Sequence, residues 1–233
     1  MDHSASHTAI LYFSRSPDAE ASHKVVHRGS RKSNKRVLGL LVGHTLTQAR
    51  RSGMDVIQVD ETRQVGDTFG SRLSNAFQQL FDEGYDQVIA IGNDCPALEG
   101  VNWKAVEEQV AEKKALLGPT PAGGTYLIGL HKDRFCREAF SRLPWQTSKL
   151  YSALKHLLQD DGGQPGILSP RMDLNNLADM RIYLARGTEA IQILLSSYYS
   201  DRPDSFFQVF PVESRLTSKQ SSRAPPFPSF LRV

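Results

Sequence analysis

Residues 88–130 read VIAIGNDCPALEGVNWKAVEEQVAEKKALLGPTPAGGTYLIGL, and this stretch decides how the rest of the chain is interpreted. It begins with an apolar run that is typical of a buried strand, and the run stops at Gly92-Asn93-Asp94. A helical segment follows, and then two more apolar runs, 115–118 and 126–130, flank a Gly-Gly turn. Because open α/β sheets usually bind ligands where strands end, we place Asp94 at the centre of the site.

Composition and charge limit the classes of protein that the chain can represent. Its 233 residues are enough for one large α/β domain with a core. The net charge is only +3, whereas nucleic-acid-binding proteins are usually more basic, so we expect no nucleic-acid partner. No apolar stretch reaches the roughly 18 residues that span a membrane. The cysteines, Cys95 and Cys136, lack the spacing of a metal site or disulfide framework, so we expect a cytoplasmic protein.

Strand and helix patterns alternate along the chain. The sequence predicts strands at 8–13, 54–59, 85–91, 115–117, 125–130 and 166–168. It predicts helices at 37–51, 68–83, 103–113, 134–142, 148–158 and 177–199. The alternation predicts three layers, with a mostly parallel central sheet covered by helices on both faces. We expect one domain over 1–200 and a Pro- and Ser-rich tail over 201–233.

Polar residues predict helix starts and loops. Asp67 or Thr68 is suited to cap the helix that ends near 83, and Asn102 caps or precedes the helix at 103–113. Thr147 or Ser148 is suited to cap the helix that ends near 158. The polar segment 18–36 carries several basic residues and no acid in its later part. Such a charge block indicates either a solvated loop or a loop that attracts phosphate.

Several phrases of the sequence, spread over about residues 8–180, are similar to consecutive motifs of one known family. AILYFSRSP at 9–17 resembles its opening strand, and IGNDCPAL at 91–98 resembles its "GsDcPgl". GPTPAGGTYLIGL at 118–130 resembles "GPaeDGGyyLiGl", and MDLNNLAD at 172–179 resembles "DiDTleD". Further matches are RQVGDTFGSRLSNAF at 63–77 and LPWQTS at 143–148. The family is the glycosyltransferase-A-like family of unknown function, which is also called selenodomain-associated transferase or nucleotide-diphospho-sugar transferase.

This resemblance implies a Rossmann-like nucleotide-diphospho-sugar transferase fold. It also implies a transfer reaction on a nucleoside-diphosphate sugar, or a related nucleotidyl transfer, with a divalent metal such as magnesium or manganese. The metal would be held by Asp94, Asp173 and Asn175. The nucleotide or substrate would meet Ser14, Arg15, Lys24, Gln64, Gly66, Arg72, Gly123, Gly124, Tyr126 and Trp145. Neither a catalytic residue nor the acceptor is identified.

These residues also have structural interpretations. Asp94 can form a turn or cap a helix, and Asp173 with Asn175 can cap the helix that follows. Arg15 and Lys24 equally fit a solvated surface. Trp145 lies at a Pro-Trp break, where burial in the core competes with stacking on a sugar. We interpret Cys95 as a buried packing residue, since the sequence shows no base beside it.

The sequence departs from the family pattern at several polar positions. Ala122 replaces an Asp, Asn175 replaces the second Asp of "DiD", and only Lys24 remains of the basic phrase after the first strand. Three functions therefore stay open: an active metal-dependent transferase, a nucleotide- or sugar-binding protein without turnover, and a scaffold. We rank the transferase first because Asp94 and the Gly-Gly turn are retained. A homodimer also stays open, with helix 177–199 as its contact, although that helix equally fits the core.

Overall fold

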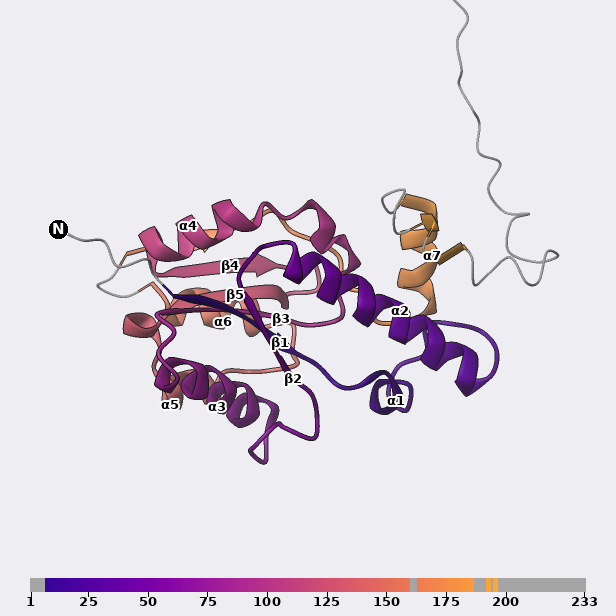
Figure 1. The fold of residues 1–233 in the computed structure, drawn as a ribbon, viewed down its shortest axis with the longest axis horizontal. Helices are drawn as coiled ribbons and strands as arrows, with labels where there is room; N and C mark the ends of the chain where they lie inside the picture. Colours follow the sequence, from indigo (N-terminus) through magenta and orange to yellow (C-terminus); the bar gives the residue numbers. More distant parts are fainter. Residues whose placement is uncertain (1–6, 160–162, 187–191, 194, 197–233) are drawn as a thin grey trace, which may run out of the picture. The chain divides into compact units, whose positions relative to one another are not determined.

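The computed structural model describes residues 7–159, 163–186, 192–193 and 195–196. Figure 1 shows that these residues form a central sheet with helices on both of its faces. The predicted tail 201–233 and parts of the predicted helix 177–199 lie outside the described residues. Among the helices that are described, none is long and apolar enough to cross a membrane.

The strands and helices follow the alternation that the sequence predicts. The strands are β1 (Thr8–Phe13), β2 (Asp55–Val59), β3 (Gln87–Ile91), β4 (Ala115–Pro119), β5 (Thr125–His131) and β6 (Gly166–Ile167). The α-helices are α1 (Pro17–Glu20), α2 (Arg31–Arg50), α3 (Phe69–Asp82), α4 (Trp103–Lys113), α5 (Arg137–Ser141), α6 (Leu150–Leu157) and α7 (Leu177–Arg186). Short 3-10 helices, Pro96–Gly100 and Lys132–Arg134, follow β3 and β5.

The sheet has the strand order β2-β1-β3-β5-β4-β6. β5 runs antiparallel to both of its neighbours, and the other three pairs are parallel, so the predicted mostly parallel sheet is confirmed. Because β5 is reversed, it begins at the edge where its neighbours end: Thr125 pairs with Pro119, and Leu127 pairs with Ile91. Loops from β1, β3, β4 and β5 therefore gather at one edge of the sheet.

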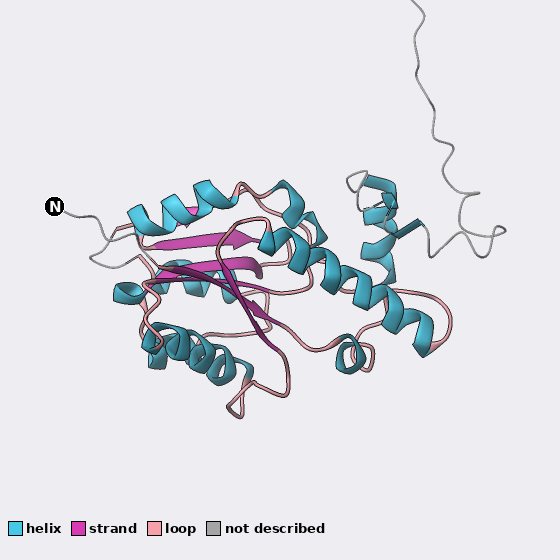
Figure 2. Cartoon of the chain, in the orientation of Figure 1, coloured by secondary structure: helices cyan, strands magenta, loops and turns pink. Residues whose placement is uncertain are grey.

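Helices bury both faces of the sheet, as Figure 2 shows by colour. β1, β3 and β4 are buried along their whole length, and neighbouring residues of β1 belong to opposite layers. Leu11 packs in the layer of α3, α5 and α6, with Phe77, Phe140 and Leu154. Ile10 packs in the layer of α2 and α4. The two apolar layers hold the sheet edge that carries the loops.

The N-terminal helices begin earlier than the sequence predicts. Ser30 caps α2 by accepting a hydrogen bond from Ser33 N at 3.2 Å, so residues 31–36 are helical and the predicted loop 18–36 is wrong there. A further short helix, α1, is capped by Ser16 and begins at Pro17. The basic residues of this segment favoured a loop in the sequence-based prediction. The segment is helical because Ser30 caps it and because α2 buries Asn34 and packs against the core.

The predicted caps were right for two helices and wrong for one. Thr68 caps α3, and Asn102 caps α4. α6 begins at Leu150 without a side-chain cap, so neither Thr147 nor Ser148 caps it. The Thr147 hydroxyl instead donates to the carbonyl of Pro144 at 2.7 Å, which closes the turn that precedes the helix.

Gly70 allows α3 to approach the segment that follows α5. A Cβ atom at Gly70 would lie 2.2 Å from the carbonyl oxygen of Ser141 and 2.5 Å from Cδ1 of Trp145. By contrast, a Cβ atom at Gly43, in the interior of α2, would have no atom within 4 Å. The first glycine is required by packing, and the second is not.

We expect Gly70→Ala to lower the free energy of unfolding by about 2–3 kcal/mol, because the new methyl group overpacks this contact. Gly43→Ala is the matched control, and it should raise that free energy by about 0.5–1 kcal/mol through helix propensity. Urea denaturation of both variants measures the two effects. Equal stability of the two variants would contradict the packing described here.

Candidate functional site

A cleft of about 540 Å³ lies at the edge where β1, β3 and β4 end and β5 begins. This volume lies within the range of small-molecule sites. Most of the residues that the motifs singled out line it: Ser14, Arg15, Gln64, Arg72, Asp94, Gly124, Tyr126, Trp145, Asp173 and Asn175. The structure therefore brings together residues from distant parts of the chain.

Two carboxylates share one end of the cleft. Asp94 follows β3, and its carbonyl accepts a hydrogen bond from Leu174 N at 2.6 Å, which holds Asp173 beside it. Burial, and then the charge of Asp94, raises the pKa of Asp173 to about 6, although a hydrogen bond with the Thr120 side chain acts in the opposite direction. The two acids thus sense each other inside a partly desolvated site.

Lys24 is not among the residues that line the cleft, but it contacts one of these carboxylates. Its ammonium donates to Oδ1 of Asp94, and its side chain is only 8% exposed, whereas that of Asp94 is 44% exposed. The Lys24 charge also acts to lower the pKa of Asp173. The sequence assigned Lys24 to the nucleotide, and the structure places it on the predicted metal ligand.

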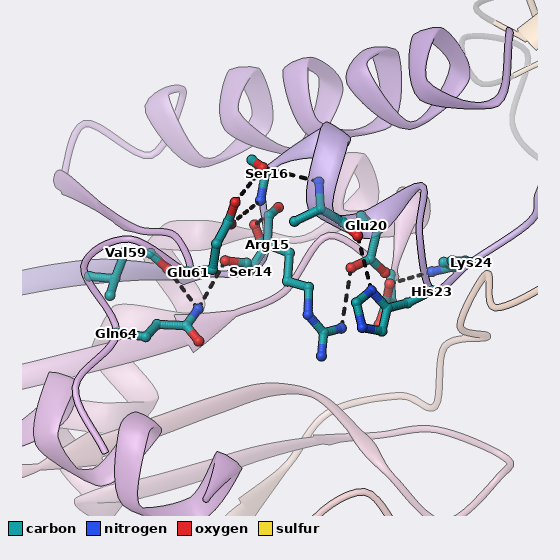
Figure 3. Close-up of polar contacts among 11 residues, drawn as sticks. Ser14, Arg15, Ser16, Glu20, His23, Lys24, Val59, Glu61 and Gln64 are labelled. Atoms are coloured by element: carbon teal, nitrogen blue, oxygen red, sulfur yellow. Dashed lines mark hydrogen bonds and ion pairs between the residues drawn. The ribbon is translucent and has the colours of Figure 1, made fainter. Parts of the chain in front are cut away.

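A polar network holds the loop after β1, as Figure 3 shows. The Gln64 amide donates to the carbonyls of Ser14 at 3.0 Å and Val59 at 3.3 Å. Arg15 pairs with Glu20 at 3.5 Å, and their side chains are 37% and 10% exposed. Gln64 therefore positions this wall, while the Arg15 guanidinium lines the cleft in reach of solvent.

Sequence reasoning missed Glu20 and Thr120, which also line the cleft. The signal for Glu20 was present: Ser16 and Pro17 begin a short helix, and Glu20 stands four residues before Lys24. Their side chains can therefore lie on one side of the chain. Thr120 carries no comparable signal, because it closes the β4–β5 turn through bonds with Gly124 that are formed only in the fold.

Aromatic rings form another wall of the cleft. The ring centroids of Phe69 and Trp145 are 5.5 Å apart, and those of Phe140 and Trp145 are 4.9 Å apart. Nε1 of Trp145 donates to the carbonyl of Phe140 at 2.9 Å. Trp145 thus packs against the core and also lines the cleft. Its position is therefore compatible both with a role in the core and with stacking on a ligand. Tyr126 lines the cleft too, and its hydroxyl donates to the carbonyl of Ser169 at 3.1 Å.

Two of the predicted glycines shape the backbone and do not line the cleft. Gly123 has a φ of +83°, and a Cβ atom there would lie 2.0 Å from the carbonyl oxygen of Ser148. Gly66 has a φ of +134°, and its Cβ atom would lie 2.6 Å from Oγ of Ser71. Only Gly124 of the predicted glycines lines the cleft. Both backbones need glycine because other residues rarely adopt these angles.

Arg72 and Asn175 line the cleft from opposite ends of the chain. Arg72 also donates to the carbonyl of Asp67 at 3.4 Å. The backbone nitrogen of Asn175 donates to the Asp179 carboxylate at 2.8 Å, which ties this segment to α7. The thiol of Cys95 lies in the core layer of α4, and burial raises its pKa to about 12, so it stays protonated.

The donor set at Asp94 and Asp173 fits a hard divalent cation. Mg²⁺ in particular is usually bound by one or two carboxylates, with water and substrate phosphates as the other ligands. Within the described ranges, no group of three or more His, Cys, Asp or Glu side chains is arranged to hold a metal. A metal here would therefore be shared between the protein and a phosphate-bearing ligand, with Asn175 in the same part of the cleft.

We expect Asp173→Asn to raise the free energy of unfolding by about 1–2 kcal/mol at pH 8. Each pKa unit corresponds to about 1.4 kcal/mol, and solvent screens part of the repulsion. Since the folded-state pKa of Asp173 is about 6 and the ordinary pKa of an aspartate side chain is 3.8, ionisation of Asp173 destabilises the fold as the pH rises between these values. Most of the gain should therefore vanish at pH 4.

Urea denaturation at pH 8 and pH 4 measures this effect. Asp67→Asn, at an exposed position, is the matched control and should change stability little at either pH. An Asp173→Asn variant that is less stable than the wild type at pH 8 would show that the carboxylate supports the fold.

Comparison with known proteins is informative at the level of family and fold. Residues 33–147 match a family described as an uncharacterized protein conserved in bacteria (DUF2064). No protein with a curated description matches the chain. Two remote structural likenesses concern the manganese complex of Rv0371C from Mycobacterium tuberculosis H37Rv, with a TM-score of 0.46, and a CMP:2-keto-3-deoxy-manno-octonic acid synthetase with CTP, with a TM-score of 0.40. Each is 12% identical; they cover 77% and 82% of this chain and 99% of their own.

A stronger likeness is to the crystal structure of a candidate nucleotide-diphospho-sugar transferase from Desulfovibrio desulfuricans G20. Its TM-score is 0.64 at 21% identity, over 84% of this chain and 98% of that chain. At this identity the likeness concerns the fold. The match of residues 33–147 to that family and this likeness in fold both agree with the resemblance of the sequence motifs to a glycosyltransferase-A-like family of unknown function.

Proposed function

We propose that the protein is a metal-dependent transferase that acts on a nucleoside-diphosphate sugar. One observation carries the proposal. The carboxylates of Asp94 and Asp173 both line the cleft, where burial and their mutual repulsion raise the pKa of Asp173. Retaining two interacting acids in a partly buried cleft costs stability, and such perturbed groups cluster at functional sites. The substrate class rests on the motif resemblance and on the volume of the cleft.

In this proposal, charged residues of the cleft contact the metal and the phosphates, and aromatic residues contact the sugar or the base. Asp94 and Asp173 would hold the divalent cation, which would neutralise charge on the leaving diphosphate when bound. Arg15, in the loop after β1, lines the cleft and carries a partly exposed guanidinium that suits phosphate oxygens. The rings of Phe69 and Trp145 offer an apolar wall to a sugar or a base.

Ala122 favours a second candidate, a nucleotide- or sugar-binding protein without turnover. It lines the cleft at the position where the family pattern has an Asp, so one carboxylate of that pattern is lost from the site. Binding experiments alone do not separate the two candidates. Release of the nucleoside diphosphate, with the sugar transferred to water or to an added acceptor, does separate them, because only the transferase performs that step.

We expect one class of nucleoside-diphosphate sugar, with Mn²⁺ or Mg²⁺, to raise the melting temperature of the wild type by about 5 °C or more at saturation. Asp94→Asn should abolish the metal-dependent part of the shift, because it removes a metal ligand. Asp86→Asn is the matched control: it lies at the other end of β3, pairs with Lys132 at 2.7 Å, and should leave the shift intact.

A thermal-shift screen followed by a release assay measures these effects. A shift with nucleoside triphosphates in place of nucleotide sugars would favour nucleotidyl transfer. A shift without release of diphosphate would favour the binding protein. The absence of a shift with every nucleotide tested would contradict both.

A further inference from the structure

Lys24 is a buried cation beside the acidic end of the cleft, where it contacts Asp94. Its ammonium donates to Asp94, and its charge acts on Asp173 as well. With a side chain only 8% exposed, it would be costly to bury without these partners. Lys24 therefore acts as an internal counter-ion for the two acids that would hold the divalent metal.

Hydrogen bonds hold the backbone of Lys24, and a separate contact with Asp94 holds its side chain. The buried Asn34 amide donates to the carbonyl of Lys24 at 2.7 Å, and its oxygen accepts from Val26 N and His27 N at 2.9 and 3.1 Å. The backbone nitrogen of Lys24 donates to the carbonyl of Glu20 at 2.9 Å. A lysine side chain has four flexible methylenes and a rotatable ammonium, so it can change partner without moving this anchored backbone.

We propose that Lys24 and the divalent metal compete for Asp94, and that a diphosphate ligand relieves the competition by taking over the ammonium. The inference rests on the proposed function, because it uses the same two acids. Metal alone must displace the ammonium from Asp94 when no phosphate is present to receive it. When a diphosphate is present, the ammonium binds a phosphate oxygen, and Asp94 becomes free for the metal.

This exchange couples the two ligands. Metal strengthens the binding of diphosphate, and diphosphate strengthens the binding of metal by the same factor, as linkage requires. Lys24 is thus a positioning residue that makes the site load metal and diphosphate together. Without Lys24, the two acids would face each other uncompensated and would bind a divalent cation even when no phosphate is present.

The test is calorimetric titration of the full chain with Mn²⁺ in buffer without phosphate. We expect Lys24→Met, which keeps the apolar stem and removes the charge, to bind Mn²⁺ at least tenfold more tightly than the wild type. Asp94→Asn added to Lys24→Met should remove the gain. Lys35→Met is the matched control, since Lys35 is exposed and pairs with Asp18 at 2.9 Å, and it should leave the affinity unchanged. Unchanged Mn²⁺ affinity in a folded Lys24→Met variant would overturn the proposal.

A second measurement keeps the proposal testable if Lys24→Met does not fold. Wild-type affinity for Mn²⁺ is then measured with and without pyrophosphate, corrected for the metal that pyrophosphate binds in solution. We expect pyrophosphate to tighten Mn²⁺ binding at least tenfold, and independence of the two ligands would contradict the exchange. Failure of every nucleotide sugar to bind the wild type would contradict only the proposed function, because the Mn²⁺ titration of Lys24→Met contains no nucleotide.

Discussion

The pairing of β3 with parallel β1 on one side and reversed β5 on the other is the constraint on which the site depends. β3 is buried along its whole length, so apolar layers on both faces fix where it ends. Asp94 lies in the loop that follows that end. The reversal of β5 brings the turn between β4 and β5 to the same edge, so that Gly124 and Thr120 line one cleft with Asp94. A parallel β5 would have carried this turn away.

Repulsion between the carboxylates of Asp94 and Asp173 is the second feature that organises the cleft. Asp173 is held near Asp94 by the backbone bond of Leu174, and burial, followed by repulsion from Asp94, raises its pKa. Lys24 offsets part of that repulsion from a buried position. Several other polar atoms in the cleft, such as the Gln64 amide and the Tyr126 hydroxyl, donate to backbone carbonyls and so stabilise its walls. The carboxylates and Arg15 are the groups best placed to meet a charged ligand.

Local sequence patterns predicted much of the fold and part of the cleft. The apolar run 8–13 forms β1 with the predicted bounds, and Thr68 and Asn102 cap their helices as expected. The prediction failed at 31–36 because a block of like charges is typical of a loop. The cap at Ser30 and the burial of Asn34 stabilise a helix there instead. Thr147 failed as a cap because its hydroxyl is used within a turn. Both errors arise where nearby partners outweigh intrinsic preference.

By itself, the sequence determined the alternation of strands and helices and the position of Asp94 at a strand end, because apolar periodicity and turn residues are local properties. The tertiary structure decided that Asp173 and Lys24 meet Asp94, that Trp145 both packs and lines the cleft, and that Gly66 and Gly123 lie outside its lining. These outcomes depend on the order β3-β5-β4 and on the direction of β5. Strand order is set by packing between segments that are distant in sequence, which no local pattern records.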